Sequence, residues 1–287
     1  MQTAEIKQQV REFYDQVGWQ QVGEGVYQNA RYEDLRPVSR EYIHRCHLRV
    51  GRFLKPAGRY LLDAGSGPVQ YPEYLTYSQG FTFRVCADLS IVALQEARKR
   101  LGERGLYVVA DVAHLPFRPG AFESVVSLHT LHHLPPEDHA QAYAELYRAL
   151  APGCPAVIVN GWTNSPLMAR LGGLVRLAER LTAAGRRIGG QAPPEAPSQP
   201  AADRAPKQAT GTFIQKYDPA WLAETLGDKM PYEIRCWRSV SVRFLRAVIH
   251  PQTAGRFWLK ILFRLEERFP GWMGRNGQYP LIVIRKK

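Results

Sequence analysis

One short segment constrains the fold of this chain more than any other: LLDAGSG, at residues 61–67. It begins as an apolar strand and runs directly into a Gly-x-Gly turn. Glycine suits such a turn because the chain must reverse while a ligand touches its backbone, with no Cβ atom in the way. The segment therefore predicts a ligand-binding turn at the carboxyl end of a strand. Nicotinamide and flavin sites use similar turns, so this motif alone does not identify the ligand.

Strand and helix patterns alternate from this segment onward, which predicts an α/β fold. We expect a Rossmann-like, mostly parallel sheet with helices on both faces. The expected strands are 59–63, 82–87, 106–110, 122–128 and 154–160. The helices expected between them are 70–77, 91–102 and 136–150.

Two further regions surround this core. Helical patterns at 3–16 and 38–54, joined by a Gly-rich loop at 18–32, predict a helical cap formed by the N-terminus. After the fifth strand, an amphipathic helix at 165–183 and a Pro- and Ala-rich segment at 189–211 predict an insertion. The second segment is too poor in large apolar residues to order itself, so we expect a flexible loop there.

The C-terminal part is expected to complete the sheet and to form a lid over the substrate. The elements expected there are a helix at 219–226, a strand at 233–244, a helix at 253–268 and a strand at 279–284. The four expected parts are the N-terminal cap at 1–58, a cofactor-binding core at 59–162, the insertion at 163–212 and the C-terminal part at 213–287.

Three acidic residues follow three successive strands of the expected sheet: Asp63, Asp88 and Asp111. The carboxyl ends of parallel strands meet at one edge of the sheet, which is where ligands bind in open α/β folds. A carboxylate at the end of the second strand can accept hydrogen bonds from both hydroxyls of a ribose. Each acid could instead cap the helix that follows it. Three acids at equivalent positions favour binding of an adenosine-bearing ligand.

These motifs together resemble those of class I S-adenosylmethionine-dependent methyltransferases. Within that class, the sequence is most similar to the group that contains the ubiquinone and menaquinone biosynthesis methyltransferases and many natural-product methyltransferases. The matching segments are LLDAGSG at 61–67, ADLS at 87–90, ADVAHLPF at 110–117 and SLHTLHHL at 127–134. The chain departs from the family pattern at Val69, where a third glycine would complete Gly-x-Gly-x-Gly.

The resemblance implies S-adenosylmethionine as the cofactor and assigns residues to it. It implies that Asp63, Gly65 and Gly67 hold the methionine part, and that Asp88 holds the ribose. Asp111 and Val112 are implied for the adenine, and the neighbouring Ala64, Ser66 and Leu89 are also expected to contact the cofactor. The resemblance also places His129 beside the cofactor and Tyr14 as an aromatic residue that closes over it.

The histidines at 129, 132 and 133 follow the fourth strand of the core. Because histidine titrates near neutral pH, His129 and His133 are candidate catalytic bases, and His132 is an alternative. A metal site is not expected, since no acids or cysteines accompany these histidines at metal-ligand spacing. Methyl transfer needs a base only when the acceptor is an unactivated hydroxyl or a carbon acid.

The distribution of charge along the chain indicates which kinds of partner it could bind. Residues 1–162 carry 17 Lys and Arg against 17 Asp and Glu, so the net charge of +12 belongs to the remainder of the chain. A basic region can meet nucleic acid, a membrane surface or an anionic substrate, or it can be a solvated surface. Peripheral membrane contact is therefore an expectation. Nucleic acid is disfavoured, because residues 128–131 read LHTL where an Asn/Asp-Pro-Pro-aromatic motif would mark methylation of a base amino group.

We therefore expect methyl transfer to a small-molecule acceptor that is apolar, such as a lipid, quinone, polyketide or glycan-like metabolite. A nucleic-acid methyltransferase and a non-catalytic protein that only binds S-adenosylmethionine are the alternatives. The four cysteines are far apart, the N-terminus is polar, and no long apolar stretch is present. These features predict a cytoplasmic protein.

Overall fold

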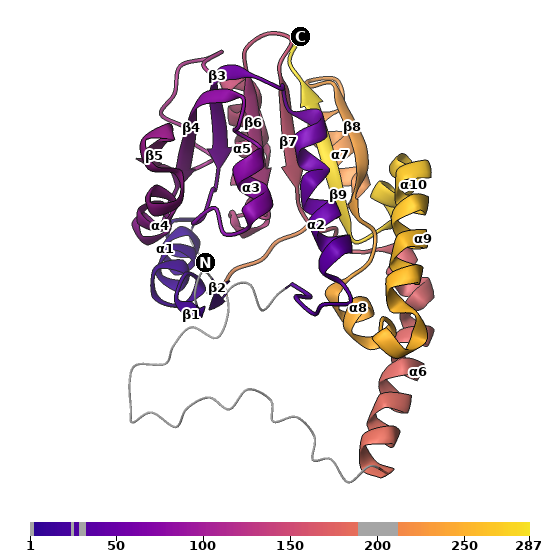
Figure 1. The fold of residues 1–287 in the computed structure, drawn as a ribbon. Helices are drawn as coiled ribbons and strands as arrows, with labels where there is room; N and C mark the ends of the chain where they lie inside the picture. The colour runs from indigo at the N-terminus through magenta and orange to yellow at the C-terminus, as the bar shows by residue number, and fades with distance from the viewer. Residues whose placement is uncertain (1–2, 24–25, 29–32, 189–211) are drawn as a thin grey trace.

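The computed structural model describes residues 3–23, 26–28, 33–188 and 212–287, and the expected flexible loop at 189–211 lies outside them (Figure 1). The described residues form a seven-stranded sheet in the order β5-β4-β3-β6-β7-β9-β8 and a separate two-stranded sheet, β1-β2. The strands of the large sheet are β3 (Gly58–Ala64), β4 (Phe81–Asp88), β5 (Gly105–Val109), β6 (Ser124–Leu128), β7 (Pro155–Val159), β8 (Tyr232–Arg238) and β9 (Tyr279–Arg285). The small sheet contains β1 (Gln21–Gly23) and β2 (Val26–Tyr27).

Five neighbouring strands of the large sheet are parallel, and of the two from the C-terminal part β9 runs in the opposite direction. In β3, Asp63 lies opposite Cys86 of β4 and Val126 of β6. β9 runs antiparallel to both β7 and β8. The predicted Rossmann-like fold with a mostly parallel sheet is therefore confirmed. The five parallel strands bring their carboxyl ends to one edge, the lower edge in Figure 1.

Successive side chains of each central strand enter two different cores, because a strand alternates its side chains between the two faces of a sheet. Leu61 packs in one core and Leu62 in the other, and both are fully buried. The first core also contains residues of α2, α3, α4, α8 and α9, whereas α5 and α7 cover the opposite face. The helices on both faces follow from strands that are apolar on both sides.

Each predicted helix is present, with ends within six residues of its predicted bounds, but two short helices of the C-terminal part, Val242–Val248 and Pro270–Asn276, were not predicted. The helices are α1 (Thr3–Phe13), α2 (Arg40–Leu48), α3 (Pro72–Thr76), α4 (Ile91–Leu101), α5 (Asp138–Ala149), α6 (Pro166–Ile188), α7 (Pro219–Leu226), α8 (Val242–Val248), α9 (Gly255–Arg268) and α10 (Pro270–Asn276). The predicted strand at 233–244 was wrong in its second half, which begins α8. There the Ser241 side chain accepts a hydrogen bond from the Phe244 amide and caps the helix, so the strand cannot continue.

The N-terminal cap lies at the carboxyl edge of the sheet (Figure 1). α1 is followed by a π-helical turn at Tyr14–Gly18, which contacts α4. α2 instead packs on the first core, where Arg49 just beyond it donates to Glu266 of α9 at 2.8 Å. Segments more than 200 residues apart are thereby held together around the rim of the site.

Candidate cofactor and acceptor site

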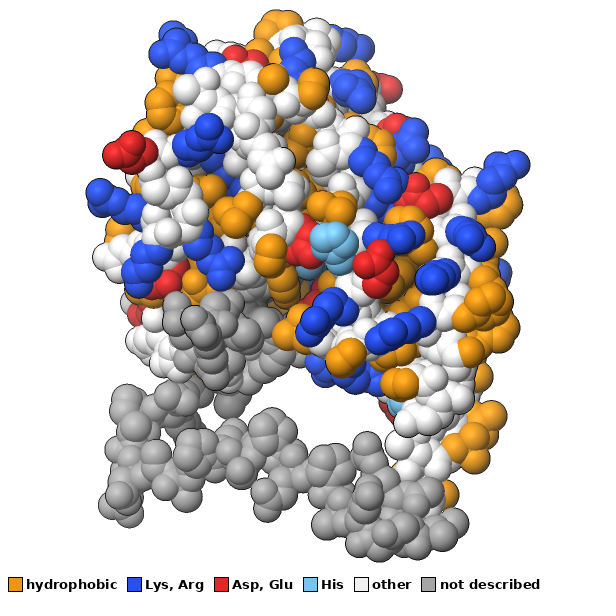
Figure 2. Space-filling model, viewed as in Figure 1, with side chains coloured by type: hydrophobic (Ala, Val, Ile, Leu, Met, Phe, Trp, Pro, Cys, Tyr) orange, Lys and Arg blue, Asp and Glu red, His pale blue; other side chains and the backbone are white. Residues whose placement is uncertain are grey.

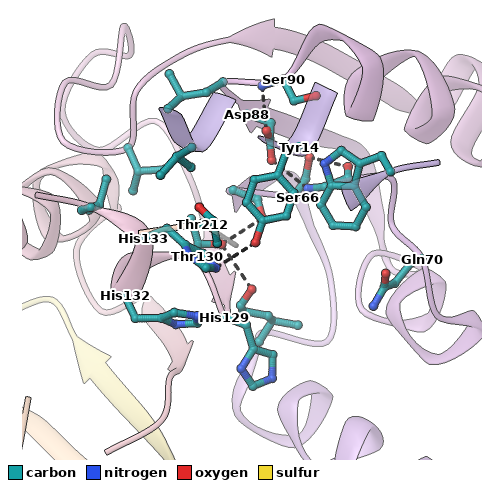
Figure 3. Close-up of a pocket in the computed structure, with 18 of the residues that line it drawn as sticks. Tyr14, Ser66, Gln70, Asp88, Ser90, His129, Thr130, His132, His133 and Thr212 are labelled. Atoms are coloured by element: carbon teal, nitrogen blue, oxygen red, sulfur yellow. Dashed lines mark hydrogen bonds between the residues drawn. The ribbon is translucent and has the colours of Figure 1, made fainter. Parts of the chain in front are cut away.

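A cavity of about 380 Å³ opens at the carboxyl edge of the sheet. The glycine turn after β3, the end of β4, the loop after β6, the N-terminal cap and part of the C-terminal region all contribute walls. In Figure 3, Asp88 and Ser90 lie at one end, His129 and His132 lie at the other, and Tyr14 lies between them. The volume falls in the range of roughly 300–1,000 Å³ typical of small-molecule sites.

The glycine turn has the backbone conformation that the motif predicts. Gly65 and Gly67 have φ values of 73° and 52°. A Cβ atom on Gly65 would lie 2.1 Å from the side chain of Thr130, so no other residue fits there. Val69, which replaces the third glycine, also has a positive φ of 54°. Such strain costs on the order of 1–3 kcal/mol, and complete burial of the Val69 side chain in the core offsets it.

Asp88 is held directly beside this turn. Its carboxylate accepts hydrogen bonds from the Gly67 amide at 2.8 Å and from the Ser90 amide at 2.9 Å. Burial raises the pKa of Asp88 to about 6, and these two amides oppose that effect. A carboxylate can accept about four hydrogen bonds, so capacity remains for the two hydroxyls of a ribose.

The side chain of Asp63 lies behind the wall of the cavity in this structure. It is buried within the sheet, is not part of the cavity wall, and pairs with the buried Arg84 at 2.5 Å. In this structure the carboxylate of Asp63 is taken up by Arg84, and its direct contact with the methionine part of the cofactor stays a prediction. Arg84 also donates to the Tyr74 carbonyl, so the pair joins β3, β4 and α3 behind the glycine turn. Ala64 is likewise buried outside the wall.

Asp111 is also not part of the cavity wall, whereas its neighbours Ala110 and Val112 are. Its carboxylate accepts from Lys7 of α1 at 2.5 Å and from the Ala113 amide at 2.9 Å. In this structure Asp111 contacts the cap through Lys7, and its contact with the adenine stays a prediction. The wall at this end consists of the apolar neighbours and of Lys7 itself.

Tyr14 and His133 join the cap to the loop after β6. The Tyr14 hydroxyl lies 2.8 Å from Nε2 of His133, and Nδ1 of His133 lies 2.8 Å from the Phe213 carbonyl (Figure 3). Because a carbonyl only accepts, Nδ1 carries the proton and Nε2 accepts from Tyr14. Burial lowers the pKa of His133 to about 4. With both nitrogens occupied, His133 positions Tyr14 in this structure, and its role as catalytic base stays a prediction.

Trp19 covers the glycine turn from the cap side. Its ring stacks on Tyr14 with centroids 5.0 Å apart. A Cβ atom on Gly67 would lie 2.9 Å from that ring, so glycine is required for this close approach as well. The aromatic closure predicted at Tyr14 is thus part of the cavity wall, and Trp19 belongs to it.

His129 lies at the acceptor end of the cavity, by which we mean the end away from Asp88. It has a positive φ of 56°, and its ring packs against Trp237 and Tyr279. Burial, reinforced by the charge of Arg238, lowers the pKa of His129 to about 3. Burial also lowers the pKa of His132 well below its ordinary value. These imidazoles are neutral at physiological pH and are weak bases.

Sequence patterns did not reveal most of the acceptor end. Its wall includes Glu33, His47, Lys216 and Arg238. Glu33 and Arg238 form a buried ion pair between the N-terminal cap and β8. Glu33 and Arg238 are 205 positions apart and belong to no local motif, so only the tertiary fold brings them together.

The wall of the cavity fits S-adenosylmethionine. The glycines leave room for a ligand against the backbone, and Asp88 retains unused acceptor capacity. In addition, the buried Nε1 of Trp19 and Oε1 of Gln70 have no hydrogen-bond partner among the described residues, and both residues line the cavity. Buried polar atoms are nearly always paired, so these atoms indicate a polar ligand. Of the implied residues, Tyr14, Gly65, Ser66, Gly67, Asp88, Leu89, Val112 and His129 line the cavity.

Comparison with known proteins agrees with this geometry. Residues 62–158 match the family described as "Methyltransferase domain". Malonyl-[acyl-carrier protein] O-methyltransferase of Legionella pneumophila is 35% identical over 103 residues, 35% of this chain and 36% of that protein. The enzyme of the same name from Geobacter sulfurreducens is 37% identical over 125 residues, which are 42% of this chain and 45% of that protein. The chain thus spans less than half of either relative.

A solved structure extends the likeness of fold to almost the whole chain. Geranyl diphosphate C-methyltransferase from Streptomyces coelicolor covers 98% of both chains with a TM-score of 0.53, at 15% identity. Residues 62–158 therefore form a methyltransferase domain, as the resemblance predicted, and the cofactor of such a domain is S-adenosylmethionine.

Proposed function

We propose that this chain transfers a methyl group from S-adenosylmethionine to a small-molecule acceptor bound at the acceptor end of the cavity. One observation carries the proposal. The glycine turn and Asp88 share a single cavity with a second, differently built end, where Lys216 and Arg238 lie. A protein that only binds the cofactor has no need of this second compartment.

The cofactor supplies a methyl group already activated by the sulfonium. The protein's main task is then to align the acceptor and to exclude water. The hydrogen bond of Tyr14 to His133 and the contact of Trp19 with Gly67 close the cap over the cavity. Lys7 anchors the same cap through its ion pair with Asp111, and this structural role does not require Asp111 to contact the cofactor.

The low pKa values of the histidines bear on the acceptor. His129 and His133, with pKa values of about 3 and about 4, remove protons poorly at neutral pH. This favours an acceptor atom that is nucleophilic without deprotonation by the protein, such as a carboxylate oxygen. The name of the two curated relatives describes O-methylation of a malonyl group, which accords with such an acceptor.

A screen for release of S-adenosylhomocysteine tests the proposal. Carboxylates, quinones, polyketides and transfer RNA are each supplied with S-adenosylmethionine. We expect turnover with at least one small molecule and none with RNA. Turnover with RNA alone would favour the nucleic-acid alternative. Cofactor binding without turnover on any acceptor would favour a non-catalytic protein.

We further propose that an anionic membrane surface is a partner of the C-terminal part. An apolar stripe runs along α9 into α10: Phe257, Trp258, Leu265, Phe269 and Trp272, each between 42% and 56% exposed. Exposed cations on α9 flank it, namely Arg256, Lys260, Arg264 and Arg268. Figure 2 shows Lys and Arg side chains over this side of the molecule and apolar side chains along its edge. Large aromatic residues beside cations are typical of interfacial helices on acidic bilayers.

Sedimentation with lipid vesicles tests this contact. We expect binding to vesicles containing phosphatidylglycerol, with little binding to pure phosphatidylcholine, and loss of binding in Trp258→Glu. Leu106→Glu, on the opposite edge strand β5, is the matched control and should bind normally. Capture of an acidic carrier protein without any vesicle binding would contradict the proposal. Among the described residues, no helix is long and apolar enough to cross a bilayer.

A further inference from the structure

The acceptor end of the cavity holds one more positive charge than negative. Arg238 and Glu33 are buried and paired, so their charges offset each other. Lys216 also lines the cavity, and its ammonium makes no ion pair or hydrogen bond with the described residues. Its ammonium lies close to the backbone, since a Cβ atom on Gly161 would be 3.2 Å from Nζ. The carboxyl edge thus carries a partly buried cation that has no counter-ion in the part of the chain that the structure describes.

Nearby polar atoms are also left without partners. Nε of Arg238 is buried and makes no hydrogen bond within the described residues. Neither nitrogen of His47 makes one by geometry, although Glu73 Oε2 lies 3.5 Å from Nδ1 and Glu33 Oε2 lies 3.9 Å from Nε2. Leaving a buried donor unpaired costs about 1–3 kcal/mol, and more when it is charged. A native site tolerates such atoms when a ligand completes them.

The pKa values of the nearby histidines indicate that Arg238 and Lys216 act on the same end of the cavity. Burial is the largest cause of the low pKa of His129, and the charges of Arg238 and Lys216 add to it. Lys216 also lowers the pKa of His132 and of His133. The imidazoles are neutral, and protonation would only make them positive, so they cannot supply the missing negative charge. Burial lowers the pKa of Lys216 itself, as expected for a cation removed from water without a partner.

We propose that the acceptor carries one anionic group, a carboxylate or phosphate, which pairs with Lys216 while its apolar body packs against Tyr71, Tyr74 and Tyr279. This inference rests on the proposed function, because it names the acceptor class of the same site. The anion restores the charge balance of the compartment, and Nε of Arg238 is a further donor for it. The three tyrosines line the same cavity and provide aromatic surface for the rest of the molecule.

A matched pair of probes separates charge from apolar contact. Octanoate and octanol have the same chain length and differ in the charged end. Their affinities are measured by calorimetry with the full chain saturated with S-adenosylhomocysteine. We expect octanoate to bind roughly tenfold more tightly than octanol, the ratio that one charge-assisted hydrogen bond provides. Inorganic phosphate should compete with octanoate if a phosphate serves as well as a carboxylate, and should not if the site selects carboxylates.

Substitution of the cation gives the second arm. Lys216→Met should reduce the octanoate affinity to that of octanol, and Lys216→Arg should restore most of the difference. Lys229→Met, the same change at an exposed lysine beyond α7, should have no effect. Unchanged binding of S-adenosylhomocysteine by each variant shows that the fold and the cofactor site are intact.

The outcomes distinguish this inference from the proposed function. If wild type binds S-adenosylhomocysteine but shows no preference for octanoate, the anionic acceptor is wrong and the methyltransferase proposal stands. The same holds if Lys216→Met keeps the full preference. If S-adenosylhomocysteine itself does not bind, the proposed function fails first.

Discussion

Asp88 shows how a single side chain connects the sheet to its ligand. The residue ends β4, and its carboxylate is fixed by the amides of Gly67 and Ser90 before any ligand arrives. Because the carboxylate is already held in place, less conformational entropy is lost when a ligand binds to it. Burial raises its pKa to about 6, which is high for a group that must be ionised to accept two ribose hydroxyls. The affinity for the cofactor should therefore depend on pH.

We expect the affinity for S-adenosylhomocysteine to be constant above pH 7 and to fall as the pH drops through about 6. The affinity falls at low pH because the ligand binds the ionised carboxylate, and a carboxylate with a raised pKa takes up a proton at a higher pH than usual. Asp88→Asn should weaken binding about 10- to 100-fold at pH 8, since hydrogen bonds to a charged acceptor contribute about 1.5–3 kcal/mol. The variant should also lose the pH dependence. Calorimetry from pH 5 to 8 measures both, and a wild-type profile flat through pH 6 would contradict this role.

At the scale of elements, the sequence predicted the core better than the cap. The parallel strands and their helices follow from local apolar patterns and from turns rich in glycine. The position of Asp111 could not be predicted, because its partner Lys7 lies 104 residues away on α1. α10 was also missed, since its seven residues begin at Pro270 and form no extended apolar period. Local patterns specify elements, whereas the partners of charged side chains depend on packing.

The cap element provides a prediction of its own. Lys7 reaches Asp111 at 2.5 Å and Asp138 at 2.6 Å, and these contacts anchor α1. Lys7→Met should destabilise the closed position of the cap by about 1 kcal/mol. Hydrogen exchange in residues 3–18 should therefore be faster, and S-adenosylhomocysteine should bind roughly three- to tenfold more weakly. Gln8→Met, an exposed change one residue along, is the control. Equal exchange in the two variants would show that the anchor has no role in closure.

On the scale of the whole molecule, the N-terminal and C-terminal parts meet in a buried polar cluster. Glu266 of α9 is 1% exposed and accepts from Tyr42 at 2.7 Å, from Ser239 and from Arg49 at 2.8 Å. The cluster lies on the side of the sheet covered by α2 and α9. Segments from both ends of the chain are thereby held as parts of one folded unit around the same sheet.

Removing one charge from this cluster should destabilise the entire fold. Glu266→Gln should lower the free energy of unfolding by about 2–3 kcal/mol, because Arg49 loses the fully buried one of its two carboxylate partners and keeps only the partly exposed Glu267. Glu267→Gln removes a neighbouring carboxylate that is partly exposed, and should cost about 1 kcal/mol or less. Urea unfolding monitored by tryptophan fluorescence distinguishes the two. Similar losses in both variants would mean that the buried cluster does not join the two parts.

The central claim is that the cavity at the carboxyl edge binds the adenosyl and methionine parts of one cofactor. Calorimetric titration of the purified chain with S-adenosylhomocysteine and, separately, with NADH tests it most directly. We predict one saturable site for S-adenosylhomocysteine, sensitive to Asp88→Asn, and no binding of NADH. Binding of NADH in preference to S-adenosylhomocysteine, or of neither ligand, would contradict it.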